Sequence, residues 1–260
     1  MTTSPAFTAT ACFEPLESRT LLSTSYDFMS LMGYNRLGAS WKYSTTGTVV
    51  GPTGQSESLT QSGKITIGSK KVKYDNQLST VAKFATSDLN LTTAWYSTAK
   101  GTFQSLSAFS AEGNSLSINL HDTCIAPKAM QIGQTFKDAG TFDGSLSIDY
   151  YGDTITGTFS GKDTVSSSLS GQQKVKTRAG TFNAIKGTYT VTTTGKMKLK
   201  YLGQSVTLNF TAVETATFWA VPNVGEVKQV ASMNIALSGY GQSFSSTVNE
   251  TSTLISYTLP

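Results

Sequence analysis

The stretch S-V-T-L-N-F-T, residues 205–211, alternates polar side chains with apolar ones. Val206, Leu208 and Phe210 therefore share one face of an extended chain, because successive side chains in a β-strand point to opposite sides. One apolar and one polar face is typical of an antiparallel sheet that covers a core on one side and meets water on the other. The stretch predicts a strand in such a sheet.

The same period of two continues from about residue 26 onward, most clearly in residues 115–120, 145–150 and 188–192. Glycine-containing turns, at which the chain can reverse, separate these segments. The turns read Gly51-Pro52-Thr53-Gly54, Gly152-Asp153 and Gly239-Tyr240-Gly241. A short helix is expected only around Tyr26–Met32. The sequence predicts an all-β fold, a strongly curved antiparallel sheet that forms a half-barrel or a barrel-like structure.

The composition of the 260 residues agrees with strand faces that are covered by hydroxyl groups. The chain has 34 serines and 40 threonines, whereas Asp, Glu, Lys and Arg together make up 14%. Threonine is β-branched and fits a pleated surface. The net charge of +4 is small and is spread along the chain.

Lysines occur in two short rows, at residues 70–73 and at alternate positions from 196 to 200. The second row shares one strand face, because alternate residues point the same way. A basic face could attract nucleic acid or anionic glycans, but we interpret both rows as solvated or edge-protecting lysines. No recognition helix or basic and aromatic pattern indicates nucleic-acid binding.

A glycine followed by threonine and an aromatic residue recurs along the chain. We interpret the glycine as a turn residue with positive φ, after which the aromatic residue enters a strand with its ring pointing inward. The spacing is irregular, so the unit is not a solenoid repeat. The five copies begin at Gly101, Gly140, Gly157, Gly180 and Gly187.

A longer echo relates the two parts of the chain. L-G-A-S-W-K at residues 37–42 resembles I-G-Q-T-F-K at 132–137, and each is followed by a Gly-Thr step. We therefore expect one β domain over residues 26–260, with related units at 26–125 and 126–260 in one continuous sheet. Two separate subdomains are the alternative, but no linker rich in proline or charge divides the units.

These segments also carry a resemblance to a known group. Together with V-K-T-R-A-G-T-F-N-A-I-K at 175–186 and F-W-A-V-P-N-V-G-E-V-K at 218–228, they are similar to TapB-like secreted or envelope β-proteins. The resemblance covers most of residues 37–230. It implies a strongly bent antiparallel sheet, such as an open half-barrel akin to lipoprotein-carrier folds. It transfers no catalytic residue, because the group has none assigned.

The N-terminus carries a second resemblance. Residues 13–23, F-E-P-L-E-S-R-T-L-L-S, resemble the LEPR-XLL sorting motif of bacterial extracellular proteins, with Ser18 in place of the usual proline. The motif implies that residues 1–25 are an export leader and that the protein is extracellular or on the cell surface. These residues have few large apolar groups in any period, so we expect them to be disordered. A short amphipathic turn is the alternative reading. The matching residues are Leu16, Glu17, Arg19, Leu21 and Leu22.

Other targeting signals are weak. No base precedes Arg19 and no apolar core of a signal peptide is present. Cys12 follows Ala9-Thr10-Ala11, a faint likeness to a lipoprotein cleavage site. No apolar run approaches the length of a transmembrane helix.

The single histidine offers no catalytic or metal site by its sequence context. His121 stands near Cys124 in His-Asp-Thr-Cys, but the two side chains would face opposite sides of a strand. Zinc sites need three or four protein ligands. A serine hydrolase needs a base, for which His121 is the only candidate, and no G-x-S-x-G nucleophile elbow on a strand–helix turn is present. We therefore expect His121 to be a surface or strand-end residue and Cys124 a small buried one.

Four aspartates cluster in the sequence and are candidates for glycosidase carboxylates or calcium ligands. Without a recognisable loop spacing, we interpret them as turn or outward-facing strand residues. No catalytic, cofactor or metal residue is therefore predicted. The aspartates are Asp143, Asp149, Asp153 and Asp163.

These observations favour a non-catalytic surface protein that binds an apolar or glycan ligand or a surface partner. Trp95 and Tyr96 are the candidate ligand contacts, because adjacent strand residues face opposite sides and one of the two rings would be exposed. A purely structural envelope or matrix component is the alternative, and an enzyme that uses aspartates is a third reading. A filled sheet interior would favour the structural component.

Overall fold

The computed structural model describes residues 25–74 and 76–260. Almost all of this chain is β-strand, with one short helix. The first elements are β1 (Ser25–Tyr26), α2 (Phe28–Leu31), β2 (Ser40–Val50), β3 (Ser56–Ile67), β4 (Val72–Tyr74), β5 (Gln77–Ala85), β6 (Asn90–Ser97), β7 (Gly101–Ala111), β8 (Asn114–His121), β9 (Cys124–Pro127) and β10 (Met130–Gln131). Six longer strands follow, β11 (Thr135–Tyr150), β12 (Asp153–Thr177), β13 (Gly180–Tyr201), β14 (Gln204–Val221), β15 (Gly225–Gly239) and β16 (Gln242–Thr258).

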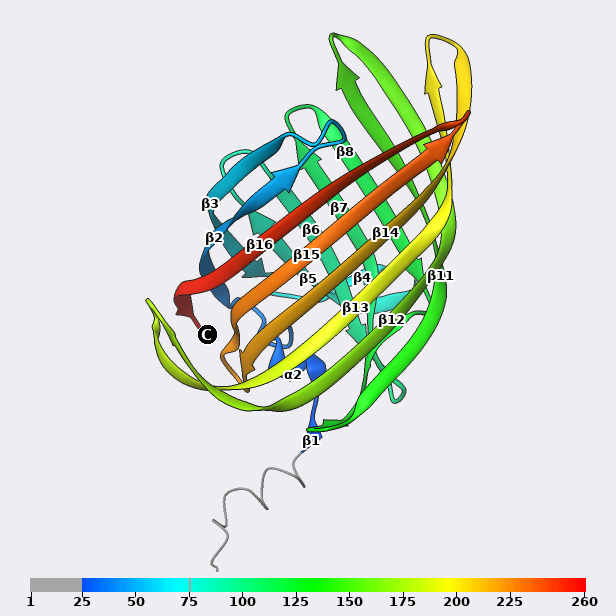
Figure 1. Cartoon of the computed structure of the whole chain (residues 1–260). Coiled ribbons are helices and arrows are strands. Elements are labelled where there is room, and N and C mark those ends of the chain that lie inside the picture. The colour runs from blue at the N-terminus through cyan, green and yellow to red at the C-terminus, as the bar shows by residue number, and fades with distance from the viewer. Residues whose placement is uncertain (1–24, 75) are drawn as a thin grey trace, which may run out of the picture.

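The strands form a closed wall. Around the wall the order is β3-β2-β16-β15-β14-β13-β12-β11-β8-β7-β6-β5, and β3 closes the ring by pairing with β5. Within the described ranges, twelve strands thus make an antiparallel barrel, seen from the side in Figure 1. The all-β prediction is confirmed, and of the two forms expected for the curved sheet the structure shows the closed one. The sheet passes from the first predicted unit to the second without a break, through the β8–β11 pairing.

The register divides the residues of the wall into an inner and an outer face. Residues directly opposite each other in an antiparallel pair point to the same side. Phe210 of β14 lies opposite Leu237 of β15, which lies opposite Phe244 of β16, and these three face inward with the core residue Phe218. The alternate positions of β12, β13 and β14 are mainly threonine, serine and lysine on the outer face. The predicted period of two is therefore confirmed in the wall.

One end of the barrel is plugged by α2, which Figure 1 shows at the end opposite the tips of the long hairpins. The helix begins after Asp27, whose side chain accepts a hydrogen bond from the Met29 N–H and caps the first turn. The Phe28 ring packs between two parts of the wall, 6.5 Å from Trp95 of β6 and 6.2 Å from Phe218 of β14. The short helix expected around Tyr26–Met32 is confirmed, and it fills this end.

The wall near α2 is fastened by polar side chains that reach across strands. Trp41 of β2 donates its indole N–H to the Val224 carbonyl at 2.6 Å. Tyr43, also on β2, donates its hydroxyl to the Glu226 carbonyl at 2.7 Å. Both rings are buried, so these bonds satisfy polar atoms that burial removes from water.

The glycine–threonine–aromatic units are strand segments, and their predicted turn role is wrong for four of the five copies. Gly101 begins β7, and the glycines at 140, 157 and 187 lie inside β11, β12 and β13; only Gly180 has positive φ, at 142°. The missing side chain instead makes room for a neighbour. A Cβ on Gly187 would strike Phe218, and one on Gly157 would strike Leu199. The inward direction of Phe142 and Phe159 is as predicted, but it is wrong for Phe103, whose ring shares the outer face with Tyr96.

Three predicted features have different outcomes in the structure. The turns at residues 51–54, 152–153 and 239–241 join strands as expected. The sorting motif of residues 13–23 lies outside the described residues. The internal relation between units 26–125 and 126–260 stays a prediction.

Candidate binding site

The half of the barrel away from α2 has an apolar inner face that is not covered. Inward positions on five strands of this half carry large apolar side chains that remain between 36% and 51% exposed. A packed interior would bury such side chains almost completely. We call this region, lined by these residues and their inward neighbours, the open half. The five are Phe109, Ile148, Val206, Ile235 and Phe244.

Three phenylalanines line the wall of the open half at the level below these exposed residues. The rings of Phe142, Phe159 and Phe210 lie 5.8 to 6.2 Å apart, in edge-on or tilted contacts. Gly161 and Gly195 face each other between them, on β12 and β13. Because these glycines carry no side chains, the rings can spread along the wall. Phe142 and Phe159 are thereby buried, at 3% and 7% exposed, and Phe210 keeps part of its surface on the inside of the barrel.

Carboxylates lie deeper, on the inner face of β14, β15 and β16. Glu214 accepts a hydrogen bond from the Tyr189 hydroxyl at 2.7 Å. The Gln229 amide donates to that hydroxyl at 3.2 Å and to the Glu226 carboxylate at 3.5 Å. Tyr189 packs on the core cluster around α2, so this polar chain lies where the filled half meets the open half.

Burial changes the acidity of these groups. Loss of water around Glu226, with a smaller effect of the Glu250 charge, raises the pKa of Glu226 to about 8. The pKa of Glu250 is raised by burial and then by Glu214. Burial and the neighbouring Glu214 also raise the pKa of Tyr189 well above its ordinary value. The polar layer is therefore less charged near neutral pH than its composition suggests.

The arrangement offers an apolar surface with hydrogen-bonding groups at its inner end. Such a site suits a ligand with an apolar body and a polar end, because a few placed polar groups orient the ligand while apolar contacts supply most of the affinity. In the part of the chain that the structure describes, no three His, Cys, Asp or Glu side chains gather to hold a metal ion. Among the described helices, none has the length and apolar character needed to cross a membrane.

The predicted ligand contacts Trp95 and Tyr96 lie on opposite faces of β6, as their adjacency requires. Trp95 faces inward, is 8% exposed, and stacks on Tyr34 at 4.8 Å. Tyr96 faces outward and stacks on Phe103 at 5.0 Å. The structure thus places Trp95 in the core of the filled half. Neither ring lines the open half, and contact of either with a ligand stays a prediction.

His121 ends β8, and the structure confirms it as a partly exposed strand-end residue. Its Nε2 lies 2.6 Å from the Asp143 carboxylate, which also accepts a hydrogen bond from Asn119 at 2.9 Å. These two partners, Asn119 first, lower the pKa of Asp143. The cluster is on the outer face of the wall, away from the open half.

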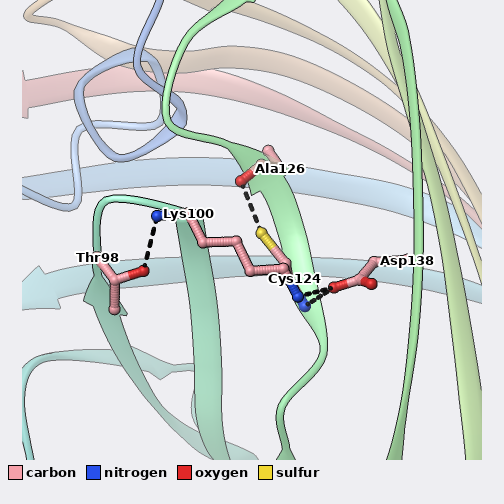
Figure 2. Close-up of polar contacts among 5 residues, drawn as sticks. All are labelled: Thr98, Lys100, Cys124, Ala126 and Asp138. Atoms are coloured by element: carbon pink, nitrogen blue, oxygen red, sulfur yellow. Dashed lines mark hydrogen bonds and ion pairs between the residues drawn. The ribbon is translucent and has the colours of Figure 1, made fainter.

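Cys124 is buried beside a different carboxylate, as Figure 2 shows. Its backbone N–H donates to Asp138 at 2.9 Å, and its thiol donates to the Ala126 carbonyl at 3.1 Å. Lys100 pairs with the same Asp138 at 3.1 Å. Burial, and then the Asp138 charge, raise the pKa of the thiol. The predicted small buried cysteine is confirmed.

The interpretation of the four aspartates holds for three of them and is wrong for Asp163. Asp143, Asp149 and Asp153 are exposed, whereas Asp163 faces inward on β12 and is 1% exposed. No hydrogen-bond partner reaches either of its carboxylate oxygens in the described structure. Burial raises its pKa, and the nearby Thr123 hydroxyl only partly opposes the rise.

Sequence reasoning also missed the carboxylates of the inner face. Glu214 occupies an inward position of β14, and the inward positions around it are all apolar. They are Leu208, Phe210, Ala212, Ala216 and Phe218. A charged residue at an inward position of an alternating strand was the available signal.

No family model matches the chain, and no curated protein matches it. The resemblance to TapB-like proteins therefore stays a prediction. Among solved structures, the chain is similar to a “putative lipoprotein” from Parabacteroides distasonis, at 10% identity and a TM-score of 0.31 over 85% of this chain and 95% of that one. A second is a “putative exported protein with YmcC-like fold” from Bacteroides fragilis, at 11% identity and 0.29 over 86% and 96%. The fold described above rests on this chain's own strand pairing.

Proposed function

We propose that the protein is a non-catalytic binding protein that holds an apolar ligand, such as a lipid acyl chain, in the open half of its barrel. The observation that carries the proposal is the exposure of Phe109, Ile148, Val206, Ile235 and Phe244 on an inward face. Exposed apolar side chains that gather on one surface mark a binding site.

The contrast between the two faces of the wall supports an apolar ligand over a glycan. The inner face carries mainly phenylalanine, leucine, isoleucine and valine, with single polar positions such as Ser107 and Ser246 between them and the linked hydrogen-bonding groups around Glu214 at the inner end. The outer face of β12 to β14 carries hydroxyls and lysines. A sugar would need polar partners along its whole length, whereas an acyl chain needs them only at its head.

The unfilled open half also argues against the purely structural alternative. A component made for packing would bury its inner face, as the half around α2 does with Phe28, Leu31, Trp41, Phe218 and Leu254. The LEPR-XLL resemblance supports action outside the cell or at its surface. Export of the protein is part of the proposal.

A pair of variants on β15 tests the site. Ile235 and Val230 are 36% and 40% exposed, but Ile235 lies opposite Ala212 and faces inward, whereas Val230 lies opposite Thr217 and faces outward. Titration of a fluorescent fatty acid, with fluorescence as the readout, should give saturable binding by the wild type. We expect Ile235→Lys to raise the dissociation constant at least about tenfold. An ammonium group next to an acyl chain loses hydration, and that loss costs more than the roughly 1.4 kcal/mol of a tenfold change.

Val230→Lys is the matched control and should bind the probe as the wild type does. Equal loss in both variants, or no saturable binding of the probe or of a set of lipids by the wild type, would contradict the proposal. Native mass spectrometry of the protein purified without detergent provides a second readout, because a retained lipid appears as a fixed mass increment.

A further inference from the structure

At the open end of the barrel the β7–β8 hairpin ends in the two-residue turn Glu112-Gly113, and three neighbouring hairpins end in the same kind of turn with a large apolar or aromatic residue before the glycine. They join β11 to β12, β13 to β14 and β15 to β16, and Figure 1 shows them at the end away from α2. In each, the strands pair up to the residues that flank a large side chain and a glycine. The turns are Tyr151-Gly152, Leu202-Gly203 and Tyr240-Gly241.

The large residue of each turn has a backbone conformation that suits it poorly. The φ angles of Tyr151, Leu202 and Tyr240 are 54°, 47° and 52°. Two-residue hairpins with positive φ favour Asn, Asp or Gly, and a bulky side chain there is an outlier. Turn formation alone does not explain these residues.

In the described chain, three of the four other non-glycine residues with positive φ are Asn or Asp, the types that such turns favour, and the fourth is Glu112. The remaining non-glycine residues with positive φ are Asn76, Glu112, Asp122 and Asn223, all polar. Large apolar or aromatic residues take this conformation only at the three neighbouring tips. A strained local conformation that recurs at one place on a molecule points to a function there.

The three tips are also strongly exposed. Tyr151, Leu202 and Tyr240 are 94%, 71% and 77% exposed, so none of them contributes to the core. Tyrosine has an apolar ring and a polar hydroxyl, a combination that is enriched where protein meets the headgroup region of a bilayer.

A lysine row leads to the middle tip. Lys196, Lys198 and Lys200 are exposed on the outer face of β13, and β13 ends next to Leu202. Their neighbours in register carry only hydroxyl or amide side chains: Ser160, Thr158 and Thr156 on β12, and Asn209, Thr207 and Ser205 on β14.

Three acidic residues lie near the tips: Glu112 is exposed in the adjacent β7–β8 turn, and the other two are engaged locally. Asp149 accepts a hydrogen bond from the Gly152 N–H at 2.9 Å, and Asp153 accepts one from the Tyr201 hydroxyl at 3.2 Å. The exposed side of the β13 hairpin is therefore positively charged. Basic side chains beside apolar tips are complementary to an anionic lipid surface.

We propose that this rim docks on an anionic lipid bilayer, with the three tip side chains at the boundary between headgroups and acyl chains. The lysine row then faces the anionic headgroups. Because the tips surround one side of the open half, docking would bring the proposed apolar site to its source of ligand. The inference rests on the proposed function only for this last step.

Vesicle flotation with the full chain tests the docking. Vesicles of phosphatidylcholine alone are compared with vesicles that also contain about a third phosphatidylglycerol. We expect the wild type to float with the anionic vesicles, and to float less as salt is added, because salt screens the lysines. If the wild type does not float with the anionic vesicles, the proposal is overturned.

The decisive variant replaces Tyr151, Leu202 and Tyr240 by Asn, a residue that accepts positive φ, so the turns and the fold are kept. We expect at least about a tenfold loss of vesicle partitioning, because membrane affinity scales with buried apolar area. Lys196, Lys198 and Lys200 changed to Gln should remove the salt dependence. Leu78→Asn is the control, since Leu78 is 62% exposed on β5, and it should float as the wild type does.

The outcomes separate docking from ligand binding. The docking proposal is overturned if the tip variant floats as the wild type does. It is also overturned if the wild type self-associates with rising concentration and the tip variant does not, because the rim would then bind a second copy of the chain. The fatty-acid titration without vesicles should be unaffected by the tip changes. Loss of that titration in the wild type would refute the proposed function, while flotation still decides on the rim.

Discussion

Gly187 of β13 lies directly opposite Phe218 of β14, and the Phe218 ring fills the space that a side chain on Gly187 would occupy. Phe218 is 1% exposed and in turn contacts Phe28 of the plugging helix, so the ring cannot move aside. We expect Gly187→Ala to destabilise the protein by about 1–3 kcal/mol, the usual cost of overpacking a core. Urea denaturation measures the change. Gly51→Ala is the control, since the nearest atom to its Cβ lies 3.9 Å away; an equal loss there would contradict the explanation.

Removal of the helix from its contacts with the wall should be costly. Leu31 of α2 is 2% exposed in the core cluster, and Leu31→Ala is expected to lower the free energy of unfolding by about 2–5 kcal/mol. Leu78→Ala removes the same atoms from an exposed position and should change it by no more than about 0.5 kcal/mol. Similar midpoints for both variants in urea would show that the helix does not support the barrel.

The buried Glu226 predicts a dependence of stability on pH. Its folded pKa of about 8 lies above the ordinary 4.5, so its contribution to stability is complete below about 4.5 and is lost as the pH rises through about 8. The residue keeps part of its surface, so we expect a loss of about 1–2 kcal/mol.

The variant Glu226→Gln should flatten this dependence, because an amide does not ionise. Urea midpoints compared at about pH 5 and about pH 9 would then differ less for the variant than for the wild type. Glu112→Gln, in the turn between β7 and β8, makes the same change of charge on the surface and should follow the wild type. A steeper profile for Glu226→Gln would refute the assignment.

The environment of Cys124 predicts slow reaction with thiol reagents. The residue is fully buried and burial raises its pKa, so the reactive thiolate is scarce and inaccessible. Labelling is measured in a Cys12→Ser background, which leaves one thiol. Asp138→Ala removes the acceptor of the Cys124 N–H and the partner of Lys100, and should speed labelling by about tenfold or more. Asp88→Ala, at an exposed turn, should leave the rate unchanged.

The sequence predicts the strands because their signal is local. The alternation of Val206, Leu208 and Phe210 with polar residues does not depend on the rest of the fold. The glycines of the turns mark the points where the chain reverses. The closure of the barrel carries no such signal, since it depends on residues 64–67 of β3 meeting residues 82–85 of β5. Whether the inside is filled depends on how many strands close the ring and on where α2 lies, and neither is local.

The mistaken residues share a physical cause. The sequence predicts turns at the glycines at 140, 157 and 187, because the backbone freedom of glycine is evident from the residue itself. The side chain that fills the space beside each glycine lies on another strand, which the local sequence does not show. Asp163 was read as exposed by its residue type, although its odd position places it with Phe159 and Val165 on the inner face. In both cases alternation along the strand was the better guide.

The shortest strand pairing in the barrel, between β3 and β5, is also its weak point. β3 and β5 pair over four residues, whereas β2 and β3 pair over eleven. Breathing motions should begin at this seam, so amide hydrogens of residues 64–67 should exchange with solvent before those of β12 and β13. If the β3–β5 pairing opens, the barrel becomes an open sheet with two unpaired edge strands. Unpaired edge strands can form hydrogen bonds with strands of other molecules. The seam is therefore where swapping between copies would start.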